Sequence, residues 1–241
     1  MIDLTTDYLG LKLKNPIIVA SSGLTRSLED LAKCAEAGAG AVVLKSIFEE
    51  QFLLDERSEG TGLYPEIKDY LQSGGLLDYA PRKVVEIIKK AKNQFDLPLI
   101  ASINCQSERG WVRFAQQLED AGCDGLELNI YTLPLEPEKT GEEYERHYLR
   151  IVERVREAIS LPLAVKIYHQ ITALPYFIRR LGEAGSQAVV LFNWFLEPDL
   201  DLQTLKSRQR KGQANFYLVL RWIGLLANRV GCQLAASGGV K

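Results

Sequence analysis

The stretch Ala121-Gly122-Cys123-Asp124-Gly125-Leu126-Glu127-Leu128-Asn129 joins a helix-ending Ala-Gly pair to a short apolar run that closes on a polar residue. The same arrangement occurs twice more, from Ala37-Gly38 to Lys45 and from Ala184-Gly185 to Asn193. Each glycine suits a left-handed helix C-cap directly before a buried strand. This recurrence predicts a parallel sheet whose strands alternate with covering helices.

Proline stands at the start of three further apolar runs, at Pro16, Pro98 and Pro162, a position that a strand tolerates. With the run 233–236 the sequence contains seven short candidate strands, and helical patterns separate them. The fold class is therefore α/β, and we expect a TIM (β/α)8-type barrel with about seven strands present in this chain. The predicted strands are 17–19, 41–45, 99–101, 125–129, 163–165, 188–193 and 233–236.

Length and composition favour one domain. We expect residues 1–241 to form a single barrel, opened by a hairpin over residues 3–14 that turns at Leu9-Gly10. With 46% hydrophobic and 25% charged residues, the chain can bury a core and lacks the bias typical of disorder. Two long connections, 49–79 and 197–213, are predicted to be lids or binding loops.

Charge and cysteine usage exclude several classes of partner. The formal net charge of -2 argues against nucleic acid as a partner, because phosphate binding needs a broad basic face. The four cysteines lack CxxC spacing, which indicates neither a zinc site nor a disulfide framework and favours a reduced, cytoplasmic setting. No apolar run approaches the roughly 18 residues of a membrane span, so we expect no membrane partner.

Polar residues follow the predicted strands at their carboxyl ends, where α/β barrels place their sites. Ending apolar strands in this way is costly unless something polar binds there. Amide and ammonium donors, with a Gly-Gly turn that lets a backbone approach a phosphate, favour an anionic and planar ligand such as a phosphorylated cofactor. These rim residues are Ser21, Ser22, Lys45, Asn104, Asn129, Lys166, Asn193 and Ser237-Gly238-Gly239.

Over nearly the whole chain, the order of these motifs resembles the FMN-dependent dihydroorotate dehydrogenases, and more closely their dihydroorotate dehydrogenase-like branch. The resemblance implies an FMN-binding (β/α)8 barrel, an oxidoreductase of the CH-CH donor type acting on a small-molecule substrate, and a place in pyrimidine biosynthesis. The matching motifs are Asn15-Pro16, Ala20-Ser21, Leu44-Lys45-Ser46, Gly62-Leu63, Glu127-Leu128-Asn129, Val165-Lys166, Asn193 and Ser237-Gly238-Gly239.

The resemblance also implies roles for individual residues. Lys166 would lie near N1 and the C2 carbonyl of the flavin, where its charge stabilises the reduced ring. The other FMN contacts that it implies are Ala20, Ser21, Lys45, Asn129, Asn193, Ser237, Gly238 and Gly239.

The substrate layer departs from the family pattern. Thr132 stands where the family has a Cys or Ser base, and a threonine without an adjacent base is a poor proton acceptor. Glu59 and Pro134 stand where the resemblance implies orotate-binding asparagines, and Trp194 where it implies a small hydroxyl residue. Thr132 and Lys45 are the candidate catalytic residues, and we expect dihydroorotate to be a poor substrate.

Two alternatives stay open at this point. One is a Schiff-base lyase barrel that uses Lys166 or Lys45, and the other is a non-catalytic, truncated paralogue. Because an eighth strand is missing from the count, we expect a C-terminally truncated barrel. Its open strand edges would favour a homo-oligomer, and half a phosphate site would bind FMN substoichiometrically.

Several other residues have a structural and a functional interpretation. Glu127 shares a strand face with Asn129, so we expect it inside the barrel, paired with an interior lysine. His169 is a candidate proton donor but more simply a surface residue, and Cys105 could face the flavin but more simply packs in the core. We expect His147 to be exposed, and a solvated basic run to be formed by Lys206, Arg208, Arg210 and Lys211.

Overall fold

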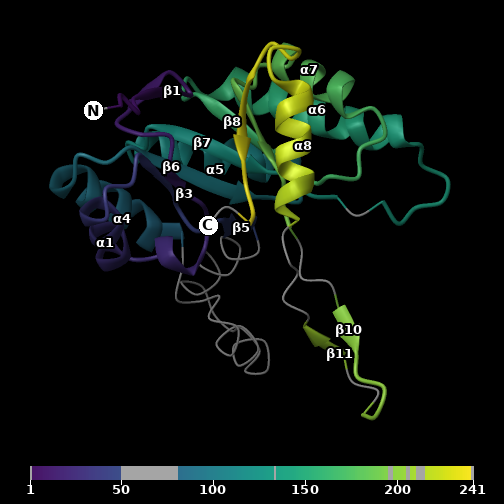
Figure 1. Ribbon diagram of the computed structural model, residues 1–241, viewed down its shortest axis with the longest axis horizontal. Helices are drawn as coiled ribbons and strands as arrows, with labels where there is room; N and C mark the ends of the chain where they lie inside the picture. Colours follow the sequence, from purple (N-terminus) through teal and green to yellow (C-terminus); the bar gives the residue numbers. More distant parts are fainter. Residues whose placement is uncertain are drawn as a thin grey trace.

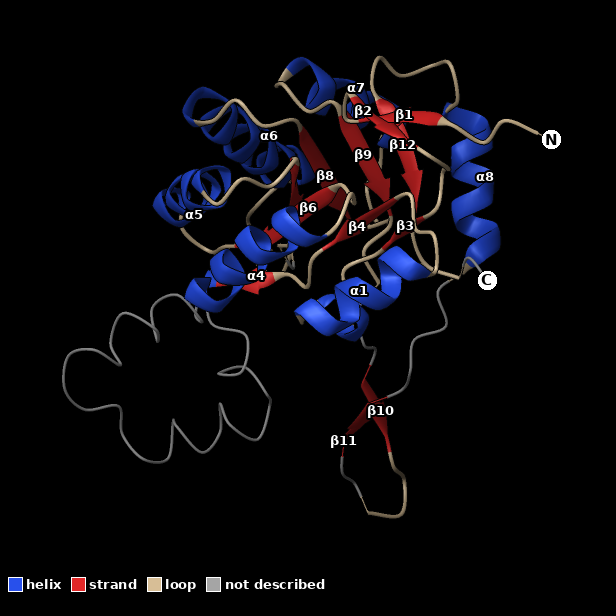
Figure 2. Cartoon of the chain, turned by 90° about the vertical axis from the view of Figure 1, so that its left-hand side faces the viewer, coloured by secondary structure: helices blue, strands red, loops and turns tan. Residues whose placement is uncertain are grey.

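The computed structural model describes residues 2–49, 81–132, 134–194, 198–204, 207–209 and 215–239. It shows a curled parallel sheet with helices around its outer face (Figures 1 and 2), as the alternating pattern predicts. Some residues singled out in the sequence lie outside the described ranges, namely Glu59, Gly62-Leu63, Lys206, Arg210 and Lys211.

The seven predicted strands are all present and pair in parallel, each beside the next in chain order. A further short strand, β5 (Ile47–Phe48), pairs with β6. Within the described residues the outermost strands β3 and β12 do not pair with each other. From edge to edge the strands are β3 (Ile18–Val19), β4 (Ala41–Val43), β6 (Leu99–Asn104), β7 (Gly125–Asn129), β8 (Leu163–Ile167), β9 (Ala188–Leu191) and β12 (Gln233–Ala236).

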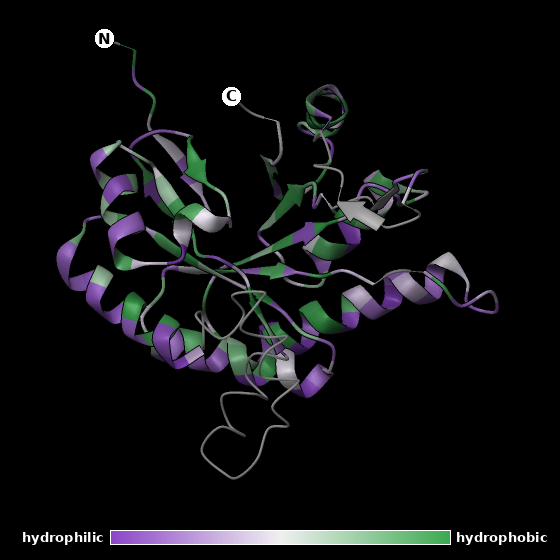
Figure 3. Ribbon diagram, turned by 90° about the horizontal axis from the view of Figure 1, so that it is seen from below, coloured by the Kyte–Doolittle hydropathy of each residue, from purple (hydrophilic) through white to green (hydrophobic). Residues whose placement is uncertain are grey.

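The helices cover the outer face of the sheet with apolar stripes and keep charged residues toward solvent (Figure 3). Ser27 caps the first α-helix, because its hydroxyl accepts the Asp30 N–H at 3.1 Å. No described helix is long and apolar enough to span a membrane. The helices are η1 (Gly23–Thr25), α1 (Leu28–Glu36), α4 (Pro81–Gln94), α5 (Glu108–Asp120), α6 (Gly141–Ala158), α7 (Leu174–Glu183) and α8 (Phe216–Leu226).

The predicted N-terminal hairpin is confirmed as β1 (Thr6–Tyr8) and β2 (Leu11–Leu13), which pair antiparallel around Leu9-Gly10. Its apolar side chains pack onto small residues of the inward strand face, forming one cluster with Ala164 and Ala188. The Gln233 side chain holds the hairpin in place by accepting the Leu9 N–H at 2.7 Å. The amino end of the sheet interior is therefore filled by apolar packing, which leaves the carboxyl end for polar groups.

The second predicted strand is interrupted where the sequence expects it to run through to Lys45. After β4, the Lys45 N–H donates to the Thr25 carbonyl at 3.1 Å, and the Ser46 N–H donates to the Ser21 hydroxyl at 2.8 Å. These two N–H groups therefore bond to the segment after β3 and not to a neighbouring strand. Pairing with β6 then resumes at Ile47, opposite Ile103.

The connection that follows β9 contains structure that the sequence does not predict. Its strands β10 (Pro198–Leu200) and β11 (Ser207–Gln209) pair antiparallel, with Asp199 opposite Arg208. The pair projects from the body of the molecule on the side of the strand carboxyl ends (Figures 1 and 2).

Glu49, the residue directly after β5, binds the start of α5 through its side chain. Its carboxylate accepts the N–H groups of Gln106 at 2.5 Å and Ser107 at 2.8 Å, and it also accepts the Ser107 hydroxyl. A Cβ on Gly110 would collide with this carboxylate, so the helix approaches it closely only with glycine there. Burial raises the pKa of Glu49, but these hydrogen bonds outweigh it and leave the pKa below its usual value.

We predict that Glu49→Gln lowers the free energy of unfolding by about 1.5–3 kcal/mol at pH 7, the range for hydrogen bonds to a charged group. Because the pKa of Glu49 is lower in the folded state, its stabilisation is complete above the ordinary value of 4.5 and is lost as the pH falls through the lower folded value. Urea unfolding of both proteins should therefore show a difference at pH 7 that shrinks below about pH 4.5. Glu86→Gln on the exposed face of α4 is the control and should change stability by no more than about 0.5 kcal/mol; an equal loss in both variants would contradict this role.

Candidate active site at the carboxyl ends of the strands

Three cations gather at the carboxyl ends of the strands. Lys166 projects from β8 and is only 9% exposed, and Lys45 follows β4. Burial, together with the positive charges of Arg26 and Lys166, lowers the pKa of Lys45. The structure thus brings together two predicted site residues and adds Arg26, which no strand-end pattern could have indicated because it follows η1. Such a cluster favours an anionic ligand.

Glu127 lies inside the sheet, as the period of β7 predicts, and is 4% exposed. Burial raises the pKa of its carboxyl, while the charge of Lys166 and a hydrogen bond from Ser102 act in the opposite direction. The expected interaction with an interior lysine is therefore present as a charge interaction with Lys166.

A row of serine hydroxyls leads from Glu127 to the rim. Ser102 donates to the Glu127 carboxyl at 3.2 Å, and the Ser46 and Ser102 hydroxyls lie 2.8 Å apart. The Ser46 and Ser21 hydroxyls lie 3.0 Å apart. We call Ser21, Ser46 and Ser102 the serine ladder. The sequence predicts Ser21 at the rim and includes Ser46 in a matching motif without a site role. It does not single out Ser102, although the alternation of β6 places Ser102 on the same face as the predicted Asn104.

Asparagine side chains form a second polar group beside the lysines. The Asn193 amide donates to Asn129 Oδ1 at 2.6 Å, and the Asn104 amide donates to the Asn129 carbonyl at 2.8 Å. Asn129 also stands opposite Lys166 in the register of β7 and β8. Three predicted rim asparagines are thus joined, and their positions depend on one another.

The Gly238-Gly239 turn follows β12 with φ angles of 93° and 76°, a conformation that strains any residue with a Cβ. Two hydrogen bonds at Ser237 hold the start of this turn, one to β9 and one to the segment after β9. The Trp194 indole donates to the Ser237 carbonyl at 2.9 Å, and the Ser237 N–H donates to the Leu191 carbonyl at 2.6 Å. Trp194 therefore positions the loop where a phosphate is expected.

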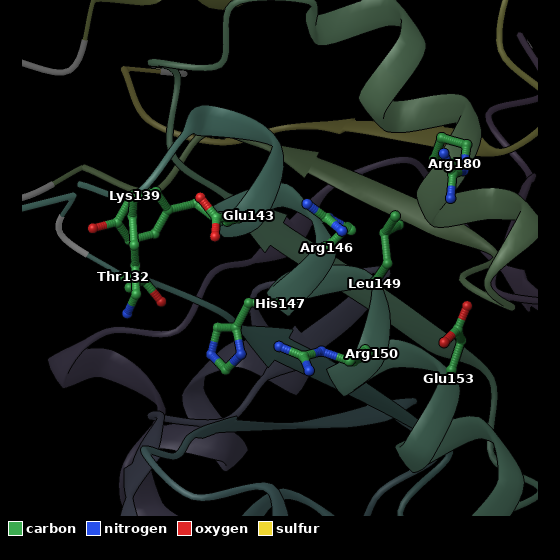
Figure 4. A pocket seen from close by; sticks show the side chains of 10 residues that line it. Thr132, Lys139, Glu143, Arg146, His147, Leu149, Arg150, Glu153 and Arg180 are labelled. Carbon is green, nitrogen blue, oxygen red and sulfur yellow. The ribbon is translucent and has the colours of Figure 1, made fainter. Parts of the chain in front are cut away.

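Thr132 follows β7 and contacts α6. Its N–H donates to the Tyr148 hydroxyl of α6 at 3.2 Å. It lines a cavity of about 240 Å³ that Tyr148 and Tyr168 also line, and a surface groove of about 690 Å³ along α6. Figure 4 shows this groove with Thr132 at one end and Arg180 at the other. The described lining of these two spaces includes neither Lys45 nor Lys166.

Four other residues differ from or refine the expectations. His169 is half-buried and stacks on Trp194, with ring centroids 5.5 Å apart, so it is not a surface residue. His147 is half-buried beside the α6 groove, so its predicted exposure is wrong. Cys105 packs in the core between the sheet and the helices. Ala20 is exposed directly after β3, at the rim where it was expected.

Sequence comparison connects this geometry to known proteins. The chain is 26% identical over 212 residues to the catalytic subunit of dihydroorotate dehydrogenase B (NAD(+)) from Thermoplasma acidophilum, covering 84% of this chain and 66% of that protein. It is 24% identical to the corresponding subunit from Bacillus thuringiensis, covering 99% of this chain and 79% of that protein. It is 25% identical to dihydroorotate dehydrogenase A (fumarate) from Lactobacillus helveticus, covering 86% and 68%.

This chain is a distant relative of the dihydroorotate dehydrogenases. No family model matches it. The chain spans slightly less than two thirds of the length of the Thermoplasma dihydroorotate dehydrogenase. Its kinship with dihydroorotate dehydrogenases agrees with the parallel sheet and with a polar group at the strand ends.

We predict that Trp194→Phe speeds amide hydrogen exchange in residues 237–239, because the loop loses the indole hydrogen bond that holds Ser237. An increase of about tenfold is expected, the factor for about 1.4 kcal/mol, which is a typical hydrogen-bond contribution. Trp111→Phe is the matched control, since the buried Trp111 indole N–H has no hydrogen-bond partner among the described residues. Equal exchange of the loop amides in both variants would show that packing alone positions the turn.

Proposed function

We propose that this protein binds FMN at the carboxyl ends of its strands and is an FMN-dependent oxidoreductase related to dihydroorotate dehydrogenase. The observation that carries the proposal is the buried Lys166 opposite Asn129 in the strand register, with Asn193 joined to Asn129 at 2.6 Å. Lys45 and Arg26 add positive charge to this group. A planar, polyanionic ligand matches a cluster of cations flanked by amide groups. Kinship with dihydroorotate dehydrogenases supports the same ligand.

The residues present fit FMN in three respects. The Gly238-Gly239 turn offers backbone N–H groups in a conformation suited to a phosphate. Lys166 and Lys45 would hold the electron-rich edge of the ring, and the amides of Asn129 and Asn193 would donate to or accept from its heteroatoms. Bound there, FMN would supply a two-electron acceptor.

The side chains of this chain would do the remaining work. Lys166 is almost fully buried, so its charge acts through a low-dielectric interior and favours negative charge beside it more strongly than an exposed lysine would. Trp194 holds the start of the glycine turn through its hydrogen bond to the Ser237 carbonyl. The rim would therefore bind, orient and electrostatically bias the group it holds.

We further propose that the substrate is a small molecule other than dihydroorotate. His147 and carboxylates of α6 line the same spaces as Thr132, but among the described residues no hydrogen bond joins the Thr132 hydroxyl to any of these bases. Tyrosine side chains surround the smaller cavity, and Glu145 supplies the charge in its lining. A carboxylate substrate would be repelled by that side chain.

We predict that Lys166→Met weakens FMN binding about tenfold or more, because the loss of a charge-assisted hydrogen bond costs about 1.5–3 kcal/mol. The same variant should lower the reduction potential of any bound FMN, since a positive charge favours the reduced anion. Flavin fluorescence titration and spectroelectrochemistry measure the two effects. Lys12→Met, which removes an exposed ion pair with Asp7 on the hairpin, is the control. Wild-type protein that binds no FMN would reject the proposed function.

We predict that the FMN-loaded protein turns over dihydroorotate at well below the ordinary enzymatic range of about 1–1000 per second. Thr132→Ala should leave this low rate unchanged, because a threonine hydroxyl without an adjacent base is a poor proton acceptor. Steady-state assays of both proteins with a dye as electron acceptor provide the measurement. Ordinary turnover by the wild type that Thr132→Ala abolishes would instead identify Thr132 as the base.

One observation favours a second function, a Schiff-base lyase. Burial and two nearby cations lower the pKa of Lys45, and these are the conditions that activate a lysine amine as a nucleophile. Borohydride reduction in the presence of small carbonyl compounds, followed by mass spectrometry, separates the two functions. A covalent adduct on Lys45 in a protein without flavin absorbance would support the lyase.

A further inference from the structure

The serine ladder connects a buried acid to the face of the site. Glu127 lies inside the sheet, Ser102 and Ser46 are 1% and 4% exposed, and Ser21 is half-buried at the rim. The three hydroxyl contacts measure 3.2, 2.8 and 3.0 Å from Glu127 outward. Each serine comes from a different part of the sheet, at the end of β3, between β4 and β5, and within β6.

When Glu127 is ionised, its carboxylate can only accept. Ser102 must then donate a hydrogen bond to Glu127, and the Ser102 oxygen accepts a hydrogen bond from the Ser46 hydroxyl. Ser46 in turn accepts the proton of Ser21, whose oxygen also accepts the Ser46 N–H at 2.8 Å. The Ser21 hydroxyl therefore donates its hydrogen bond to Ser46. Toward a ligand at the rim, Ser21 can then only accept a hydrogen bond.

When Glu127 is protonated, every bond of the ladder reverses. One proton binds the Ser21 oxygen, and the proton that Ser21 held moves to Ser46. The Ser46 proton moves to Ser102, and the Ser102 proton moves to the Glu127 carboxyl. Each hydroxyl breaks one O–H bond and forms one, so the net change is one proton gained by Glu127. Ser21 now directs its new proton outward and faces a ligand as a donor.

We propose that the charge state of Glu127 is transmitted along the serine ladder and decides whether Ser21 offers a proton or a lone pair to a ligand at the strand ends. This makes Ser21 a specificity-determining residue, and Glu127 acts through it as a positioning residue. The inference deepens the proposed function, on which it rests for an anionic ligand beside Lys166.

The groups that face Glu127 couple this switch to ligand charge. Lys166 from β8 favours the ionised carboxyl, and burial opposes it. Tyr8 from β1 is the other titratable group that interacts with Glu127, and burial together with the Glu127 charge raises its pKa, so it stays a neutral phenol. The charges of Lys45 and Lys166 also interact. An anion that pairs with Lys166 weakens its support of the carboxylate, so Glu127 takes up a proton and Ser21 becomes a donor.

The first test needs no ligand. Infrared spectroscopy of the full chain, titrated toward acid pH, should show the carbonyl stretch of a protonated carboxylic acid as Glu127 takes up a proton, and Glu127→Gln should lack this band. After dilution into D₂O, the deuterium shift of this band should develop about tenfold or more slowly in Ser102→Ala than in wild type, because the proton path is cut. Ser186→Ala is the matched control, since Ser186 is equally buried and donates to a main-chain carbonyl away from the ladder. Equal exchange in Ser102→Ala and Ser186→Ala would overturn the proposal.

The second test uses FMN as the probe. The affinity for FMN, measured by fluorescence from acid to alkaline pH, should change with pH in wild type and in Ser186→Ala. Part of that dependence should be lost in Ser21→Ala and equally in Ser102→Ala, and the double variant should lose no more than either, because both act on one path. Independent, additive losses would overturn the ladder. Absence of FMN binding would reject the proposed function alone, since the deuterium exchange of the Glu127 proton still tests the proton path through the serine ladder.

Discussion

Glu127 and Lys166 place a carboxyl and an ammonium group inside a sheet whose remaining inward positions near the hairpin are small and apolar. Removing a charge from water costs several kcal/mol unless hydrogen bonds and an opposite charge compensate it. Here the compensation comes from Lys166 itself and from Ser102, and the positions of both are set by the strand register. The polar rim is therefore an extension of one buried charge interaction.

The loops around this pair are held by main-chain hydrogen bonds rather than by apolar packing alone. The Thr25 carbonyl accepts a hydrogen bond from the Lys45 N–H, and the Ser237 carbonyl accepts one from the Trp194 indole N–H. The Glu49 carboxylate accepts main-chain N–H groups at the start of α5. At the ends of parallel strands, some main-chain N–H and C=O groups have no partner on a neighbouring strand, so each loop must supply hydrogen-bond partners for them. These partners also hold the side chains that would contact a ligand, which makes the site rigid where it is charged.

The strands were predictable because their apolar runs are short and bounded by glycine or proline, and because helical patterns separate them. The inward position of Glu127 followed from the period of two along β7. Other features left no local signal. The cluster of Arg26 with Lys45 joins segments from two loops, and the path from Ser21 to Ser102 joins three strands. The pairing of β10 with β11 occurs in a stretch whose composition is typical of a loop.

The sequence by itself determined the class of fold, the order of the strands and which residues stand at their carboxyl ends, because these depend on patterns within a few residues. Only the tertiary structure decided which of those residues meet. It directed the loop after β7 toward α6, where the Thr132 N–H donates to the Tyr148 hydroxyl. It gave Trp194 a hydrogen bond to Ser237 across 43 positions of the chain. Contacts of this kind depend on the curvature and register of the whole sheet, and no short segment encodes them.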